Sequence, residues 1–307
     1  MCLVWQNPTR PEEEIRPQVL EKLPRLFFVN ITGGEPFIRQ DLSEIVEILR
    51  KKSERMVIST NGYFTDKIIS LCKRYPRLGI RISIEGLAKA NDEIRRIPDG
   101  FDRTLRTLLE LKSMGIKDIG FAMTVQDLNF HDIVPLYLLA QGLGLEFATA
   151  VIHNSHYFHK WDNRIENKKG AAAELYRLIN LLLKSKRPKE WFRAYFNYGL
   201  INYINGNRRL LPCSMARDGF FVDPWGDVLS CNGMDKKYVI GNLKEKTWDE
   251  IWNNKSVENA RQKVKDCTRN CWMIGSAAPA IWRHPLRPVI WVLKNKLKQS
   301  LGKNNFC

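Results

Sequence analysis

Short apolar segments alternate with amphipathic helical patterns along the first half of the chain. The sequence predicts strands over 26–32, 56–60, 80–84, 118–125 and 145–151, with helices over 41–52, 66–74, 101–114 and 132–142 between them. Strands that alternate with helices in this way form a parallel sheet with right-handed crossovers. The chain is therefore predicted to have an α/β fold in which the carboxyl ends of all the strands meet at one edge. We expect Thr65 to cap the second helix and Gly115 to close the third.

A Gly-Gly turn follows the first of these strands, at Thr32-Gly33-Gly34-Glu35-Pro36. Because neither glycine carries a β-carbon, a ligand can approach the peptide groups, and Pro36 fixes the direction in which the chain leaves. Glu35 then lies at the carboxyl edge of the sheet, where α/β proteins bind ligands. The residues alone leave two interpretations open: a ligand-binding turn, or an ordinary strand-to-helix turn with a solvated glutamate.

Polar side chains also follow the other strands. They are Asn61, Ser83 with Glu85, Thr124 with Asn129, and His153 with Asn154. Any one of them could be a simple turn former. As a set they recur at the same edge of the sheet, which predicts a ligand that these groups orient.

Three of these segments, taken in order, resemble motifs of the radical S-adenosylmethionine (SAM) superfamily. They are the turn at 32–36, Ser59-Thr60-Asn61-Gly62 and Ile82-Ser83-Ile84-Glu85-Gly86, and the resemblance extends from Met1 to about Gly275. It implies a partial (β/α)6 TIM-like barrel, in which a further strand would precede the five seen here. It also implies that the turn residues Gly33, Gly34, Glu35 and Pro36 hold the methionine end of SAM.

The same resemblance implies that Asn61 and Ser83 reach the ribose or carboxylate of SAM. Glu85 stands where many relatives have Asp, which leaves its contact open. Arg95 and Arg96 resemble an arginine-bearing loop of the superfamily. A guanidinium suits a carboxylate because it donates two parallel hydrogen bonds, but the sequence does not decide which of the two arginines contacts SAM.

Cys2 resembles the last of three cysteines, spaced C-x3-C-x2-C, that hold a [4Fe-4S] cluster in this superfamily. The other two, and the strand ahead of them, are absent from the sequence. One thiolate cannot hold a four-iron cluster, and Cys72 has the pattern of a core residue, with Ile68 one helical turn before it. We therefore expect either a start placed at an internal methionine or a product that cannot carry out the superfamily's chemistry.

A second group of cysteines, Cys213, Cys231, Cys267 and Cys271, lies in the C-terminal third. A predicted hairpin over 220–229, turning at Asp-Pro-Trp-Gly, would present Cys231 at the end of its second strand. Seven cysteines are too few for a disulfide scaffold in 307 residues, so the clustering favours metal thiolates. Four thiolates could hold zinc or a [4Fe-4S] cluster, and spacing alone favours zinc.

A resemblance to the SPASM-type auxiliary-cluster domain favours the iron–sulfur cluster instead. It rests on the C-x12-G-x4-C run from Cys213 to Cys231, on Ile240-Gly241-Asn242-Leu243 and on Trp248-Asp249-Glu250-Ile251-Trp252. Glu258 and Arg261 stand where two further cysteines would be expected. The resemblance therefore implies a shortened domain with one auxiliary [4Fe-4S] cluster, whose irons are all ligated by the protein unless one is left for substrate.

Three segments outside the strands complete the predicted organisation. A radical SAM core over 1–160 is followed by a helical bridge over 161–210, in which Pro188 ends a first helix and a second covers 191–204. The cysteine domain covers 211–275, and a basic amphipathic helix covers 276–307. His153, His156 and His159 lie in an aromatic segment without neighbouring carboxylates or cysteines, so we expect the wall of a substrate cavity rather than a metal site.

The formal net charge of +16 favours an anionic partner, but no Asp or Glu follows Arg283, so much of this charge is local. Residues 281–298 mix large apolar with basic side chains. They predict either an interfacial helix on an anionic membrane or a helix docked on the barrel. Nucleic-acid binding is disfavoured because stacking aromatics are not interleaved with the charge. Without a signal peptide or an apolar run of eighteen residues, we expect a cytoplasmic protein, peripheral at the membrane in the first case.

The resemblance implies a reaction. SAM would be cleaved reductively to methionine and a 5′-deoxyadenosyl radical, which abstracts hydrogen from a peptide, lipid or cofactor-precursor substrate in a closed, dry cavity. An external electron donor such as flavodoxin or ferredoxin would be required. The alternative is a non-catalytic iron–sulfur scaffold that retains only the C-terminal cluster.

Overall fold

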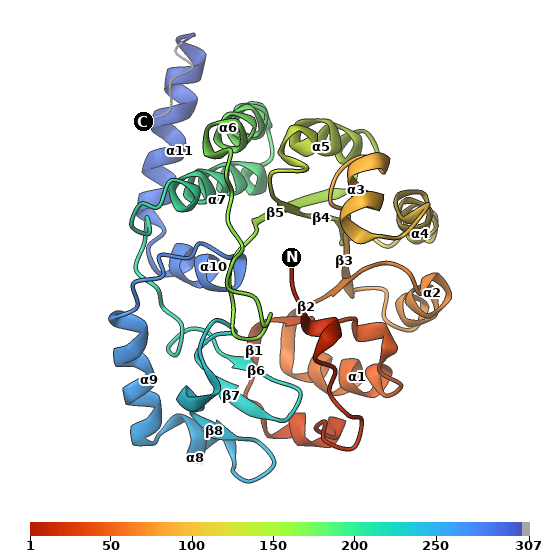
Figure 1. Ribbon diagram of the computed structural model, residues 1–307, viewed down its shortest axis with the longest axis vertical. Helices are drawn as coiled ribbons and strands as arrows, with labels where there is room; N and C mark the ends of the chain where they lie inside the picture. The colour runs from red at the N-terminus through yellow and green to blue at the C-terminus, as the bar shows by residue number, and fades with distance from the viewer. Residues whose placement is uncertain (303–307) are drawn as a thin grey trace.

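The computed structural model describes residues 1–302, and its centre is a curled parallel sheet of five strands (Figure 1). The strands lie in sequence order, β1-β2-β3-β4-β5, and each pairs in parallel with the next. Their bounds are β1 Leu26–Ile31, β2 Ser53–Thr60, β3 Gly79–Ser83, β4 Ile119–Val125 and β5 Glu146–Val151. The predicted α/β partial barrel is confirmed.

Helices connect the strands and cover the outer face of the sheet (Figure 1). They are α1 Leu42–Lys52, α2 Thr65–Arg74, α3 Ala88–Arg95, α4 Gly100–Ser113 and α5 Ile133–Gly142, with short 3-10 turns at Val4–Gln6, Pro17–Lys22, Pro36–Ile38 and Phe130–Asp132. The core is built from the apolar face of each helix and from the central strands, where Ile58, Ile80 and Phe121 are fully buried. Burial of this apolar surface is the main force that holds the helices on the sheet.

Two local predictions on the barrel helices were wrong. Thr65 does not cap α2: it is the first residue of that helix, and its hydroxyl is hydrogen-bonded at 2.7 Å to the hydroxyl of Thr107 on α4. Helix α3 was not predicted, because its few apolar residues give no stripe, and Arg95 ends this helix instead of lying in a loop. Gly115 does follow α4 in the left-handed region, with φ of +80°.

Two long helices, α6 Lys168–Lys184 and α7 Pro188–Ile204, pack against each other beside β5. Pro188 was predicted to end the first helix, but it is the first residue of the second. Proline suits this position because the first N–H of a helix has no partner within the helix. The first helix ends at Lys184, before the extended Ser185.

A small antiparallel sheet of three strands follows, in the order β6-β7-β8. The strands are β6 Phe221–Val222, β7 Asp227–Leu229 and β8 Gly241–Asn242, with a 3-10 turn at Lys236–Tyr238 before β8 and the helices α8 Trp248–Trp252 and α9 Lys255–Lys265 after it. The predicted hairpin is therefore present. The N-terminal segment contacts this sheet: Ile15 N–H donates to the Pro224 carbonyl at 2.8 Å, and Lys22 Nζ to the Leu243 carbonyl at 2.6 Å.

The predicted C-terminal helix is two helices, α10 Ile274–Arg283 and α11 Leu286–Ser300, separated at His284 and Pro285. Residues 303–307 of the predicted range lie outside the described residues. Helix α11 packs along α7 and α6 (Figure 1). Within 1–302, no helix is both long and apolar enough to cross a bilayer.

Candidate functional site at the strand ends and the cysteine cluster

The Gly33-Gly34 turn leaves the carboxyl end of β1 and lies beneath two other segments. A β-carbon on Gly33 would lie 3.6 Å from the Tyr157 hydroxyl, and one on Gly34 would lie 3.6 Å from Val4 Cγ1. Both are ordinary contact distances, so packing does not demand glycine at Gly34, whereas Gly33 has a φ of +157°, which favours glycine. The turn is thus covered by the N-terminal segment that carries Cys2 and by the loop after β5.

Glu35 joins the ends of β1 and β2. Its carboxylate accepts hydrogen bonds from the Asn61 N–H at 2.7 Å, the Thr60 hydroxyl at 2.7 Å and the Phe37 N–H at 3.1 Å. A carboxylate can accept about four hydrogen bonds. Glu35 therefore holds the turn in place and keeps acceptor capacity beyond its three bonds within the chain.

Asn61, Ser83 and Arg95 line one small cavity of about 20 Å³, together with residues of α3 and α4. The Asn61 side chain also accepts a hydrogen bond from the Tyr63 N–H at 2.8 Å, which fixes its orientation. Arg96 does not reach the cavity, because it is exposed and has a left-handed backbone with φ of +57°. The structure thus separates two arginines that the sequence could not distinguish.

Glu85 and Arg95 form a buried ion pair between the end of β3 and the end of α3. Glu85, only 1% exposed, also accepts a hydrogen bond of 2.7 Å from the Thr124 N–H at the end of β4. Asn129 donates to the Glu85 carbonyl at 2.7 Å. Glu85, Thr124 and Asn129 are therefore bonded to one another, whereas Arg95 Nε is buried without a hydrogen-bond partner among the described residues.

The loop after β5, residues 152–167, contains no helix: residues 156–159 form a turn closed by a bridge between Ser155 and Lys160, so the three histidines do not share a helical face. It joins the two halves of the site: the Leu3 N–H donates to the Phe158 carbonyl at 2.8 Å, and the Ser155 hydroxyl to the Asn232 carbonyl at 2.6 Å. Burial raises the pKa of Tyr157, above Gly33, to about 12, with Asp223 adding to the effect. Tyr157 belongs to the aromatic segment that the sequence predicted as a cavity wall, but its contact with Gly33 was not predicted.

His153 is the most enclosed histidine of this loop, and its ring lies 5.0 Å from that of Phe158. Burial lowers the pKa of His153; its contact with the Val151 carbonyl acts in the opposite direction, and Arg269 lowers the pKa further. His153 is therefore neutral near pH 7.

Four cysteines gather around the small sheet. Cys213 precedes β6, Cys231 follows β7, and Cys267 and Cys271 follow α9, each of them half-buried. Burial raises the pKa of Cys231 to about 11, and the nearby thiols of Cys271 and Cys213 add to the effect. The pKa of Cys213 is likewise raised by burial, with Cys271 and Cys267 contributing. The four thiols are thus close enough to interact.

Two neighbours fix the Cys267–Cys271 loop. Arg269 donates hydrogen bonds to the carbonyls of Gly233 and Asn154, which ties the loop to the β7 side and to the segment after β5. Trp272 is buried against α7 and donates to the Phe196 carbonyl at 2.9 Å. Only glycine fits beneath this indole, because a β-carbon on Gly199 would lie 2.2 Å from the Trp272 ring.

Cys2 does not belong to a comparable group of cysteines among the described residues. Cys72, the spare cysteine of the first half, is fully buried in α2, and burial raises the pKa of its thiol to about 12. Among residues 1–302, no three His, Cys, Asp or Glu side chains are grouped closely enough to hold a single metal ion. The strand-end site therefore presents one of the three thiols of a C-x3-C-x2-C motif.

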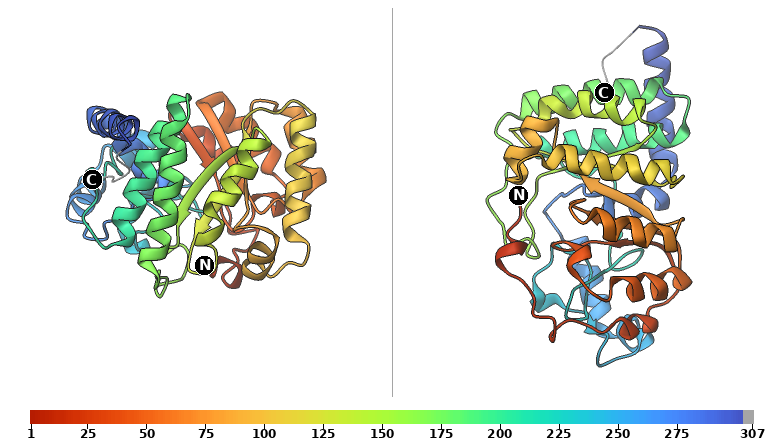
Figure 2. Two further views of the ribbon diagram at one scale, coloured as in Figure 1. Left: turned by 90° about the horizontal axis from the view of Figure 1, so that it is seen from above. Right: turned by 90° about the vertical axis from the view of Figure 1, so that its right-hand side faces the viewer.

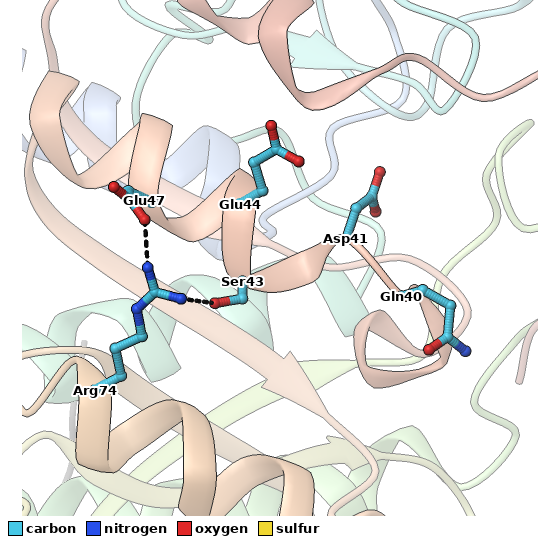
Figure 3. Close-up of a pocket in the computed structure, with 6 residues that line it drawn as sticks. All are labelled: Gln40, Asp41, Ser43, Glu44, Glu47 and Arg74. Carbon is cyan, nitrogen blue, oxygen red and sulfur yellow. Dashed lines mark hydrogen bonds and ion pairs between the residues drawn. The ribbon is translucent and has the colours of Figure 1, made fainter.

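A second cavity, of about 490 Å³, lies on the outer face of α1 and α2 and is not part of this site (Figure 3). Arg74 crosses it and donates hydrogen bonds to Glu47 at 2.6 Å and to Ser43 at 3.0 Å. None of the residues predicted to bind a ligand lines it.

Comparison with known families accounts for both halves of the site. The model of the radical SAM superfamily matches residues 4–140, and that of SPASM, an iron–sulfur cluster-binding domain, matches residues 213–272. The chain therefore carries a radical SAM domain followed by a SPASM domain. Its two matched segments contain the strand-end cavity and the four-cysteine cluster, respectively. The cofactors of this architecture are SAM and [4Fe-4S] clusters, including an auxiliary cluster in the SPASM domain.

Curated radical SAM relatives are distant. The Fe-coproporphyrin III synthase of Methanosarcina barkeri is 26% identical over 258 residues, which are 74% of this chain and 61% of that protein. The mycofactocin maturase MftC of Mycobacterium tuberculosis is 24% identical over 245 residues, 78% of this chain and 62% of that one. The chain thus spans about three fifths of the length of these relatives.

Among solved structures, anSMEcpe with bound AdoMet matches with a TM-score of 0.60 at 15% identity, over 84% of this chain and 78% of that one. At this identity the match establishes the fold: the sheet of five strands is a radical SAM partial barrel.

Proposed function

We propose that the protein is a radical SAM/SPASM enzyme, which cleaves SAM reductively and uses the 5′-deoxyadenosyl radical to abstract hydrogen from its substrate. The observation that carries the proposal is the cavity at the strand ends. Asn61, Ser83 and Arg95 come from three separate segments and converge there, and the Asn61 N–H donates to Glu35 of the Gly33-Gly34 turn. Polar groups that converge at the carboxyl edge of a parallel sheet are what a bound small molecule requires.

The residues around this cavity suit the polar ends of SAM. Glu35 keeps acceptor capacity for an ammonium group beside the open peptide groups of the turn. Arg95 has a buried Nε without a partner, so a SAM carboxylate would satisfy it. Asn61 and Ser83 would then contact the ribose. Pro36 is buried and begins the 3-10 turn that fixes Glu35.

The four C-terminal cysteines would hold the auxiliary [4Fe-4S] cluster. A tetrahedral zinc ion, with bonds of about 2.3 Å, would require sulfurs about 3.8 Å apart. Within 1–302 the side chains are not grouped for a single ion, although the four thiols interact. The match of residues 213–272 to an iron–sulfur cluster-binding domain favours the cluster over a zinc ion. Such a cluster supplies electron transfer or a substrate anchor, and Arg269 and Trp272 would hold its ligands in place.

Cys2 would be one ligand of the SAM-binding cluster. The described residues do not complete that set, because the only other cysteine of the first half, Cys72, is locked in the core. The thiols that complete it, and the electron donor, such as flavodoxin or ferredoxin, would have to come from outside residues 1–302.

We propose a peptide as the substrate. MftC is named a maturase, AlbA of Bacillus subtilis is named for the biosynthesis of the bacteriocin subtilosin, and SuiB of Streptococcus suis, a structural neighbour with a TM-score of 0.56, was solved with its precursor peptide. A cofactor precursor is the second candidate, because the Methanosarcina barkeri relative is a synthase of Fe-coproporphyrin III.

The test has two parts, both under anaerobic conditions. SAM binding to the 307-residue chain is measured by equilibrium dialysis, and 5′-deoxyadenosine is measured with dithionite as reductant. The second measurement also uses a form extended by the codons upstream of Met1. The proposal expects SAM binding by the chain and 5′-deoxyadenosine from a form that carries the complete cysteine motif. No SAM binding, or a full motif that yields no 5′-deoxyadenosine, would leave an iron–sulfur scaffold.

A further inference from the structure

Helix α11 presents a continuous apolar stripe to solvent. Its members recur every three or four residues, and the five largest are each at least 63% exposed. They are Leu286, Ile290, Leu293, Leu297 and Leu301, with Val289 beside them. Trp282, at the end of α10 before the stripe begins, is 73% exposed, and its ring centre lies 6.2 Å from that of Phe27 of β1. Contiguous patches of this kind mark binding surfaces.

The opposite face of α11 packs against the body of the protein. Pro288, Val292 and Asn295 are buried against the long helices, and Trp291 stacks on Tyr198 with ring centres 5.1 Å apart. Lys296 donates to the Leu183 carbonyl at 2.6 Å. The helix is therefore fixed to the body of the protein, and the stripe remains on its outer side.

The charge beside the stripe has one sign. Arg287 and Lys294 flank it, Lys298 follows one turn later, and residues 283–302 contain no Asp or Glu. Arg283, at the end of α10, pairs with Asp218 at 2.6 Å. A helix that combines exposed leucines and isoleucines with basic flanks matches the surface of an anionic bilayer.

A second copy of the chain fits this surface poorly. Two α11 helices in contact along the stripe would bring Arg287 and Lys294 of each copy close to like charges, with no acidic residue between positions 283 and 302 to pair with them. Flanking charges of opposite sign are what select a helix partner in a coiled coil. The phosphates of a nucleic acid would pair with the basic residues, but they would not bury the six exposed aliphatic side chains.

We propose that α11, with Trp282, binds the surface of an anionic lipid bilayer and lies in its plane. The aliphatic stripe enters the boundary between headgroups and acyl chains, Trp282 lies at the headgroup level, and the basic residues contact lipid phosphates. Both views of Figure 2 place α11 on the opposite side of the molecule from Met1. Membrane contact would therefore leave the mouth of the barrel uncovered.

The experiment is co-sedimentation of the full chain with vesicles of phosphatidylcholine and with vesicles that contain 30% phosphatidylglycerol. We expect binding to the anionic vesicles, at least tenfold weaker binding to the neutral ones, and a loss of affinity as salt rises. The double variant Arg287→Gln/Lys294→Gln should bind the anionic vesicles about 25-fold more weakly, roughly fivefold for each charge removed. Ile290→Ser/Leu293→Ser should lose roughly tenfold or more.

A matched control is available on α4 and α5, where Leu109 and Leu138 are 40% and 48% exposed but lie outside the stripe. Leu109→Ser/Leu138→Ser should bind vesicles like the parent chain, and the circular dichroism of all variants should match it. Equal binding to both vesicle types, or no binding, would overturn the proposal. A dimer in light scattering that Ile290→Ser/Leu293→Ser abolishes would assign the stripe to a second copy instead. SAM binding is measured in a separate assay. Neither outcome of the vesicle experiment therefore decides whether the proposed function is correct.

Discussion

The carboxylate of Glu35, after β1, accepts a hydrogen bond of 2.7 Å from the backbone N–H of Asn61, at the end of β2. This bond holds together the two segments that the resemblance assigns to opposite ends of SAM. The same carboxylate satisfies the Thr60 hydroxyl and the Phe37 N–H. The geometry of the turn therefore depends on Glu35 before any ligand is bound.

Glu35→Gln tests this dependence. An amide replaces one carboxylate oxygen with a group that cannot accept, so at least one of the three donors loses its partner. We expect the free energy of unfolding to fall by about 1–3 kcal/mol in urea titration, and SAM affinity to fall with it. Unchanged stability would mean that the turn holds its shape without the carboxylate.

Arg95→Lys tests the assignment of the SAM carboxylate. Lysine keeps the charge but not the planar pair of donors, and a hydrogen bond to a charged group contributes about 1.5–3 kcal/mol. SAM should therefore bind about tenfold more weakly or worse in equilibrium dialysis. Arg96→Lys is the matched control, because Arg96 is exposed and outside the cavity. If the two variants weaken binding equally, Arg95 is not the contact.

Gly199→Ala tests whether the packing of Trp272 on Gly199 holds the neighbouring Cys271 in place. The added methyl would lie 2.2 Å from the Trp272 indole, which is fully buried and cannot move freely. We expect a destabilisation of about 1–3 kcal/mol or more, together with a lower iron content after reconstitution. Gly142→Ala offers a comparison on α5, since a β-carbon there meets nothing within 4 Å. A neutral Gly199→Ala would show that Trp272 can shift without disturbing the cysteines.

His153 predicts a dependence of stability on pH. Burial lowers the pKa of His153 below the ordinary histidine value of about 6.5, so the unfolded chain binds this proton more tightly than the folded chain. Its contribution to stability is present above pH 6.5 and is lost as the pH falls below that value. The midpoint temperature of thermal unfolding should therefore decrease as the pH is lowered from 7.5 to about 5.5. The decrease should be smaller in His153→Phe. His131→Gln, at an exposed site, should behave like the parent.

Much of the barrel could be predicted from sequence, because apolar strands such as the one predicted at 80–84 are short, continuous and bounded by turn residues. Helix α3 was missed since only Ala90 and Asn91 of its residues are buried, which leaves no periodic stripe. Pro188 was misplaced because proline both ends a helix and begins one. Boundaries of this kind depend on tertiary packing, which the local pattern does not contain.

The site was only partly predictable for the same reason. The cavity residues Asn61 and Ser83 were predicted from the resemblance, because both lie in motifs that follow the order typical of the superfamily. The sequence could not decide which of Arg95 and Arg96 reaches the cavity. The choice depends on the direction that the backbone takes where α3 ends. It also gave Glu85 and Asn129 as ligand candidates, whereas the structure bonds them to each other.

The most direct test of the central claim is the anaerobic iron and sulfide content of the reconstituted chain, with electron paramagnetic resonance after reduction. We predict about four irons and four sulfides per chain, as one [4Fe-4S] cluster contains. Cys213→Ser, Cys231→Ser, Cys267→Ser and Cys271→Ser should each lose most of this iron, and Cys72→Ala should retain it. Stoichiometric zinc without sulfide, or iron that survives all four substitutions, would contradict the account.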